Sequence, residues 1–308
     1  MAPQKAIKSK LENFSDWWKR KTKKIILPGL EGLSLYNLWI IYWGGIVRGT
    51  FSTRASSIAF SFFMAIFPFL LFVLNLIPYI TFIDDFQIKF LVFMDENLLP
   101  PETSDFFGTI FEDIASTPRG GLLSVAFILS IFLMTNGVNA IFTGFEFSYH
   151  TKTNRSIPRQ YAVAVGVSVI LALLLLTSVI GAVYITYAID DLNSLGIVNS
   201  DGFGADLIKY IGFVILIYTA VAILYYFGTR EARQARFFSV GALFTTILIM
   251  ITTFLFSLYI TNFSNYNELY GSIGALLILM FYIWLNSNML LLGFELNASL
   301  IKLKKNFK

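Results

Sequence analysis

Six long apolar runs without a charged residue constrain this chain more than any other feature of its sequence. Each run is between 20 and 31 residues long. A helix rises about 1.5 Å per residue, so about 20 apolar residues cross a hydrocarbon core roughly 30 Å thick. Because lipid offers the backbone no hydrogen-bond partners, we expect helices rather than open strands. The predicted spans are 56–83, 121–145, 161–188, 209–228, 238–262 and 270–294.

The composition predicts the same class, an all-α integral membrane protein built as a six-transmembrane-helix bundle. Hydrophobic residues make up 56% of the chain and charged residues only 14%, whereas a soluble domain is about 25% charged. The sequence has no cysteine, and His150 is its one histidine. This excludes a disulfide scaffold, an iron–sulfur protein and a multi-histidine metal centre. We therefore predict neither a metal nor a cofactor.

The distribution of basic residues predicts the topology. With six spans, 20 of the 23 Lys and Arg residues fall on the side that holds both termini. By the positive-inside rule, we expect both termini in the cytoplasm. The chain then divides into a basic cytoplasmic segment, a membrane domain and a basic cytoplasmic tail (1–54, 55–300 and 301–308). The short aromatic run 32–47 and the outer loop 84–119 are expected to form amphipathic helices at the membrane interface.

The basic residues of 1–24 leave two interpretations open. Their lysines accompany an apolar helix face formed by Leu11, Phe14 and Trp18. Such a segment attracts anionic lipid headgroups at the cytoplasmic face, or it acts only as a topology determinant and surface anchor. Nucleic acid is not expected as a partner, because its recognition needs a folded basic domain. Membrane lipids are the expected partners, and a homo-oligomer is compatible with the sequence.

Four of the asparagines within the predicted spans are candidate site residues, because an unpaired polar group in a span is costly. Asn136 and Asn139 share a face of the second span, Asn288 lies in the sixth, and Asn75 lies in the first. Two interpretations stay open. The asparagines line a polar cavity between the first, second, fifth and sixth spans, or they form the hydrogen bonds that hold neighbouring helices together.

Three charged residues and one proline stand out at or within the spans. Arg54 begins the first span, Glu146 ends the second and Glu295 ends the sixth, so all three are expected at one depth. Either Arg54 pairs with one or both glutamates and closes a polar pathway, or each side chain extends separately to the headgroups. Pro68 removes the backbone hydrogen bond to the carbonyl of Met64, which predicts a kink in the first span.

Three segments together resemble one protein family. They are Ala55–Pro68, which ends in Phe-Pro, Phe256–Ala275, and Leu292–Ala298 with the sequence Leu-Gly-Phe-Glu-Leu-Asn-Ala. They are similar to segments of the YihY/virulence factor BrkB family, formerly labelled ribonuclease BN. The resemblance implies a six-span protein of the bacterial inner (plasma) membrane. It also implies a poorly defined role, for which serum resistance and lipid or envelope transport have been suggested. Gly144–Tyr149 departs from the family pattern.

Motifs that would indicate an enzyme are missing from the sequence. It contains no phosphate-binding loop, no GxSxG elbow and no HExxH pair. We therefore predict no catalytic residue. Three functions remain, in this order: transport or lipid handling in the cell envelope, a non-catalytic envelope scaffold, and a membrane-bound ribonuclease. The last would need a carboxylate cluster around a metal ion.

Overall fold

The computed structural model describes residues 21–23, 34, 36, 50–76, 120–147, 155–194, 203–229, 237–262 and 272–306. Six helices in these ranges are long and apolar enough to cross a membrane. They are α3 (Thr50–Leu76), α6 (Gly120–Glu146), α7 (Ile157–Ser194), α8 (Phe203–Gly228), α9 (Val240–Asn262) and α11 (Ser272–Asn306). The predicted all-α fold with six spans is confirmed.

Some helices extend past the charge-free runs of the sequence. α7 begins at Ile157 and ends at Ser194, and α11 continues to Asn306, whereas the predicted spans covered 161–188 and 270–294. A charge-free run shows which part of a helix can lie in the hydrocarbon core. The backbone hydrogen bonds of the helix continue beyond that run, into polar turns at the membrane surface. The predicted basic tail, 301–308, therefore begins inside α11.

The predicted interfacial helices lie outside the described residues. This holds for 32–47 apart from residues 34 and 36, for the loop 84–119, and for 1–24 apart from residues 21–23. Their amphipathic character stays a prediction from the sequence.

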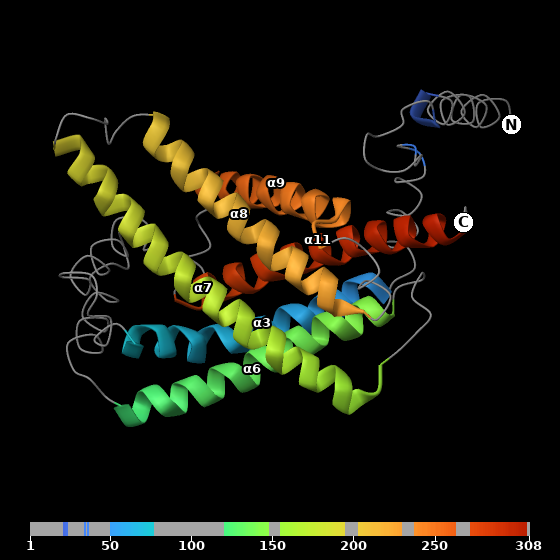
Figure 1. The fold of residues 1–308 in the computed structure, drawn as a ribbon, viewed down its shortest axis with the longest axis horizontal. Helices are drawn as coiled ribbons and strands as arrows, with labels where there is room; N and C mark the ends of the chain where they lie inside the picture. The colour runs from blue at the N-terminus through green and yellow to red at the C-terminus, as the bar shows by residue number, and fades with distance from the viewer. Residues whose placement is uncertain are drawn as a thin grey trace, which may run out of the picture.

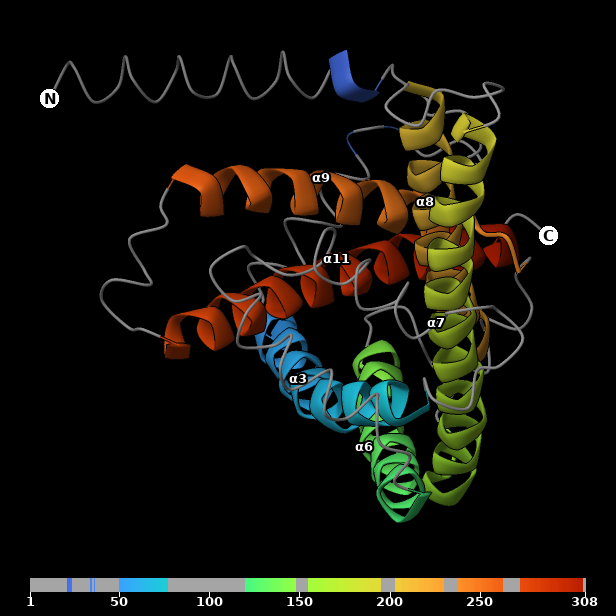
Figure 2. The ribbon, with the colours of Figure 1, turned by 90° about the vertical axis from the view of Figure 1, so that its left-hand side faces the viewer.

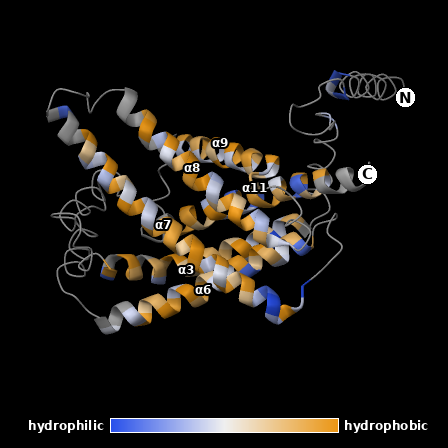
Figure 3. Ribbon diagram, viewed as in Figure 1, coloured by the Kyte–Doolittle hydropathy of each residue, from blue (hydrophilic) through white to orange (hydrophobic). Residues whose placement is uncertain are grey.

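Successive helices run in opposite directions along the bundle (Figure 1). One end, which we call the proximal end, is where α3, α7 and α9 begin and α6, α8 and α11 end. α3 packs against α6 and α11, α11 also packs against α9, and α7 packs against α6 and α8. In Figure 2, α9 and α11 lie next to each other, and their axes lie across the direction of α7 and α8. Apolar residues cover most of each helix, and hydrophilic residues gather where α7 begins (Figure 3).

Three aromatic rings from three helices pack together at the proximal end. Phe145 of α6 lies face to face with Phe294 of α11, with ring centroids 3.9 Å apart. Tyr225 of α8 meets both rings edge-on, at centroid distances of 5.5 Å and 5.7 Å. All three residues are buried. Aromatic pairs in these geometries stabilise beyond the area that they bury, so the cluster fastens α6, α8 and α11 together.

α9 and α11 cross at two glycines, Gly241 of α9 and Gly293 of α11. A Cβ atom on Gly241 would lie 2.8 Å from the carbonyl oxygen of Gly293. Small residues let helix backbones approach closely in a membrane. Tyr225 reaches into this crossing, where its hydroxyl lies 2.5 Å from Thr245 Oγ1 and donates to the Leu290 carbonyl at 2.6 Å. The crossing therefore adds α9 to the close packing of the proximal end.

Candidate functional site

A cavity of roughly 520 Å³ lies between α3, α6 and α7. It extends from Arg54 and Gly144 at the proximal end to Ser61 and Asn136, which are close to the middle of the spans Phe51–Val73 and Ser124–Glu146. Ser57, Phe147 and Tyr161 line it and are exposed, so the cavity opens at the surface of the bundle. Its full lining is Thr53, Arg54, Ser57, Ser61, Asn136, Asn139, Ala140, Thr143, Gly144, Phe147 and Tyr161.

One wall of the cavity is a row of hydroxyls on α3, formed by Thr53, Ser57 and Ser61, which we call the hydroxyl ladder. The spacing of four residues places the three side chains on one face, over a length of roughly 12 Å at 1.5 Å per residue. Within the described chain, none of these hydroxyls takes part in a hydrogen bond. Other span hydroxyls donate to their own helix, as Thr135 does to the Ile131 carbonyl. The ladder can therefore donate to a molecule in the cavity.

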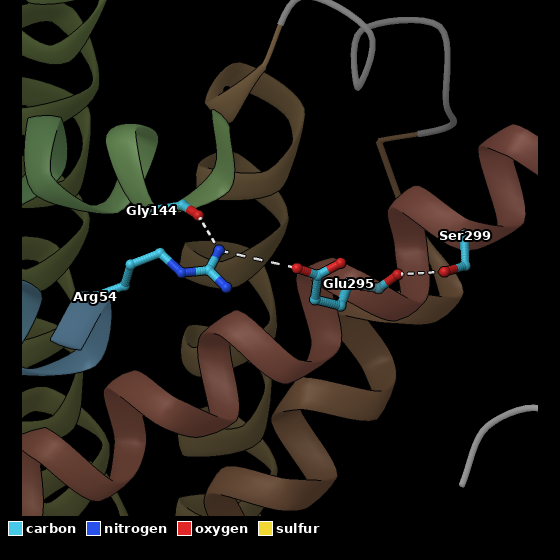
Figure 4. Close-up of polar contacts among 4 residues, drawn as sticks. All are labelled: Arg54, Gly144, Glu295 and Ser299. Carbon is cyan, nitrogen blue, oxygen red and sulfur yellow. Dashed lines mark hydrogen bonds and ion pairs between the residues drawn. The ribbon is translucent and has the colours of Figure 1, made fainter. Parts of the chain in front are cut away.

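Arg54 stands at the proximal end of the cavity, between α6 and α11 (Figure 4). Its Nη1 donates to the Gly144 carbonyl at 2.8 Å and lies 3.9 Å from Glu295 Oε1. The two charged side chains are only 14% and 10% exposed. An isolated charge at this depth is costly. The negative carboxylate of Glu295 lowers that cost for the positive guanidinium of Arg54. The Glu295 carbonyl in turn accepts a hydrogen bond from Ser299.

Gly144 lets these groups come together. A Cβ atom at this position would lie 3.1 Å from Leu291 Cδ2 and 3.3 Å from Ile58 Cδ1. α6 therefore lies tightly between α3 and α11 at the turn whose carbonyl accepts from Arg54. The close packing of the proximal end and the position of the guanidinium depend on the same residue.

Glu146 belongs to a second group of polar side chains, between α6 and α7. Its Oε1 accepts from the backbone N–H of Arg155 at 3.2 Å. The side-chain amide of Gln160 lies between Glu146 and the cavity wall. With its nitrogen toward Glu146, Gln160 donates to the two carboxylate oxygens at 3.0 Å and 3.1 Å, and its oxygen accepts from Thr143 at 3.1 Å. Since a carboxylate only accepts hydrogen bonds, we assign this orientation.

Arg155 extends this second group to α8. Its Nη1 donates to the carbonyl of Phe227 at 2.7 Å, close to the end of α8 at Gly228. The start of α7 is thereby tied to the end of α6 through Glu146 and to the end of α8 through Arg155. These contacts hold the wall of the cavity that α7 provides.

The structure brings together some of the residues singled out in the sequence and separates others. Arg54 lies beside Glu295, while the contacts of Glu146 within the described chain are with Arg155 and Gln160. The side chain of Arg54 extends toward α6 and α11 and meets Glu295 at the proximal end, where both side chains are largely buried. Glu146 lies at the α6–α7 connection instead.

The four asparagines also divide into two pairs. Asn136 and Asn139 line the cavity, where the side-chain amide of Asn139 lies 2.8 Å from the side-chain amide of Gln160. Asn75 and Asn288 are not among its lining residues, and each donates to its own helix, at 2.7 Å to the Leu71 and Trp284 carbonyls respectively. The described cavity lies between the first three spans, whereas the cavity that was one of the two interpretations of the sequence would lie between the first, second, fifth and sixth.

Pro68 lies inside α3, which is helical on both sides of it, and its side chain is buried. A kink at this residue stays a prediction.

The described residues include no group of three His, Asp or Glu side chains that could hold a metal ion. His150 is outside the described residues.

Sequence reasoning missed the hydroxyl ladder, Tyr161 and Gln160. A signal for the ladder was present, because Thr53, Ser57 and Ser61 recur every four residues beside Arg54 at the start of an apolar span. Gln160 gave no such signal, since it opens a run that was counted as apolar for its lack of charge. Its role depends on α6 and α7 meeting.

Comparisons with known proteins agree with this architecture. A family model described as virulence factor BrkB matches residues 43–306. The chain is 29% identical over 265 residues to the putative ribonuclease-like protein YfkH of Bacillus subtilis (strain 168), covering 82% of this chain and 91% of that protein. It is 20% identical over 264 residues to a UPF0761 membrane protein of Aggregatibacter aphrophilus (strain NJ8700), covering 86% and 92%. No solved structure matches the chain.

Proposed function

The chain belongs to the virulence factor BrkB family of membrane proteins, and we propose that it binds the headgroup of a membrane lipid in the cavity between α3, α6 and α7. This binding is a step in transport or lipid handling at the bacterial inner membrane. The observation that carries the proposal is a polar cavity that extends from the proximal end to residues near the middle of two spans.

The size and chemistry of the cavity support an amphiphilic occupant. Ligand pockets are typically about 300–1,000 Å³, and this one has roughly 520 Å³. Its lining combines hydroxyls, amides and one guanidinium with the apolar side chains of Ala140 and Phe147. A lipid that enters from the side can leave its acyl chains among the apolar helices and place its headgroup against the polar wall.

The proposed orientation places the proximal end in the cytoplasm, with both termini on that side. The support is the positive-inside rule, since 20 of 23 basic residues fall on this side of a six-span chain. The cavity then opens to the inner leaflet, where anionic lipids create a negative surface potential.

A non-catalytic envelope scaffold is the second candidate. The close α9–α11 crossing and the Tyr225 hydrogen bonds favour it, because such packing resists the helix movements that transport needs. A ribonuclease finds less support. The word stands in the name of the relative YfkH, while the described part of this chain offers no group of three metal-ligating side chains.

Lipid retention and lipid movement test the proposal with a matched pair of variants. Ser57→Phe places a ring inside the cavity, whereas Ile247→Phe places one on the exposed face of α9. We expect the wild-type protein and Ile247→Phe to retain lipid in native mass spectrometry. We also expect both to move a fluorescent lipid across a liposome bilayer, and Ser57→Phe to lose both properties. Retention without movement would favour the scaffold, and equal behaviour of the two variants would overturn the cavity as the binding site.

A further inference from the structure

The charged groups that line the cavity indicate which headgroup it accepts. Arg54 is the one charged residue among the described lining residues, and that lining includes no carboxylate. Glu295 and Glu146 lie close by but outside the lining. A ligand in the cavity therefore meets a positive group and neutral hydrogen-bonding groups, without an acidic side chain to receive an amine.

Arg54 and Glu295 form an ion pair in which Nη1 and Oε1 are not in hydrogen-bond contact. The separation of 3.9 Å between Arg54 Nη1 and Glu295 Oε1 is beyond hydrogen-bond length, whereas the same nitrogen donates to Gly144 at 2.8 Å. Guanidinium carries five donors and binds phosphate and carboxylate strongly. An anion in the cavity can thus share Arg54 with Glu295.

The hydroxyl ladder extends the same recognition away from Arg54. Thr53, Ser57 and Ser61 reach over roughly 12 Å of α3, and their hydroxyls make no hydrogen bond within the described chain. A phosphodiester with its glycerol offers several acceptor oxygens in a row, which suits a line of donors.

Resting on the proposed function, we propose that the cavity selects a phospholipid headgroup that is anionic overall, with its phosphate at Arg54 and its glycerol and ester oxygens along the hydroxyl ladder. Phosphatidylglycerol meets this description. Phosphatidylethanolamine brings the same phosphate but also an amine for which the lining has no carboxylate. Arg54 is the group that discriminates, and Glu295 is its counter-ion when no anion is bound.

Competitive binding in nanodiscs tests this selectivity. The full chain is placed in discs of phosphatidylcholine with small amounts of phosphatidylglycerol or phosphatidylethanolamine, and retained lipid is counted by native mass spectrometry. We expect phosphatidylglycerol to be preferred about fivefold, the factor that one basic residue contributes toward an anionic lipid surface. Arg54→Gln should abolish the preference and Arg54→Lys should keep part of it. Ser57→Ala should weaken retention, whereas Ser178→Ala, whose hydroxyl bonds its own helix, should not.

The outcomes separate this inference from the proposed function. Retention of both lipids without a preference, or a preference that survives Arg54→Gln, would overturn the selectivity and leave lipid binding standing. Absence of any retained lipid would overturn both. Inorganic phosphate added at millimolar concentration distinguishes the sources of the anion. Displacement of phosphatidylglycerol by free phosphate would overturn the lipid as the preferred occupant, and continued retention would support it. If Arg54→Gln does not fold, the wild-type preference and the Arg54→Lys variant still decide the question.

Discussion

The glycine at the α9–α11 crossing provides the sharpest test of the packing at the proximal end. In Gly293→Ala, the added Cβ would overlap Thr245 Oγ1 and lie 2.7 Å from the Tyr225 hydroxyl and 3.0 Å from the Gly241 carbonyl oxygen. Overpacking of this kind costs about 1–3 kcal/mol. Displacing the Tyr225 hydroxyl also weakens two interhelical hydrogen bonds, at about 0.6–2 kcal/mol each. Together these terms predict a loss of about 2–7 kcal/mol in the free energy of unfolding.

Gly166→Ala is the matched control, because a Cβ atom at that position of α7 has nothing within 4 Å. Its unfolding free energy should stay within about 0.5 kcal/mol of the wild type or rise slightly. Both variants are unfolded with sodium dodecyl sulfate in mixed micelles, and tryptophan fluorescence follows the transition. If Gly293→Ala unfolds at the wild-type denaturant fraction, or if both variants lose stability equally, the backbone contact between α9 and α11 is wrong.

The remaining predictions concern the hydrogen bonds of Tyr225 and Gln160 and the axis of α3. Tyr225→Phe should lower the free energy of unfolding by about 1–4 kcal/mol, because its hydroxyl makes two hydrogen bonds. Tyr226→Phe is the control, since Tyr226 has no hydrogen bond in the described chain, and equal stability of the two variants would refute the prediction. Gln160→Leu should cost about 1–3 kcal/mol in the same micelle titration because Glu146 loses donors, and wild-type stability would contradict the assigned amide orientation. Pro68→Ala restores a backbone donor and should straighten α3, which spin labels at the two helix ends would register as a longer distance; an unchanged distance would exclude the kink.

The six spans could be predicted because lipid penalises charge, and a charge-free run records that penalty along the chain itself. The ends of α7 and α11 could not be set in the same way, since backbone hydrogen bonding does not stop where the apolar run stops. The length of a span is a property of the lipid, whereas the length of a helix is a property of the backbone.

The depth of Arg54, Glu146 and Glu295 follows from their places at the ends of spans, but their neighbours do not. Whether Arg54 extends toward Glu295 or Glu146 depends on which helices pack together, and no spacing within one helix contains that information. The same limit applies to Asn288. Its face on the sixth span can be calculated, yet its amide bonds the Trp284 carbonyl one turn away. A polar face alone did not distinguish a cavity wall from a locally satisfied side chain.

The central proposal is that a polar cavity reaches the middle of the membrane and opens toward the proximal end, which we propose to be cytoplasmic. Because the chain has no native cysteine, single cysteines test it directly. Ser61→Cys places a thiol in the cavity, and Ser168→Cys places one in the buried interior of α7. Both lie the same number of residues from the proximal starts of their helices, Thr50 and Ile157. A charged, membrane-impermeant thiol reagent is applied to each side of proteoliposomes made of zwitterionic lipid. We predict that Ser61→Cys reacts from the cytoplasmic side alone and that Ser168→Cys reacts from neither. A thiol at position 61 that is as unreactive as the one at 168 from both sides would contradict the claim.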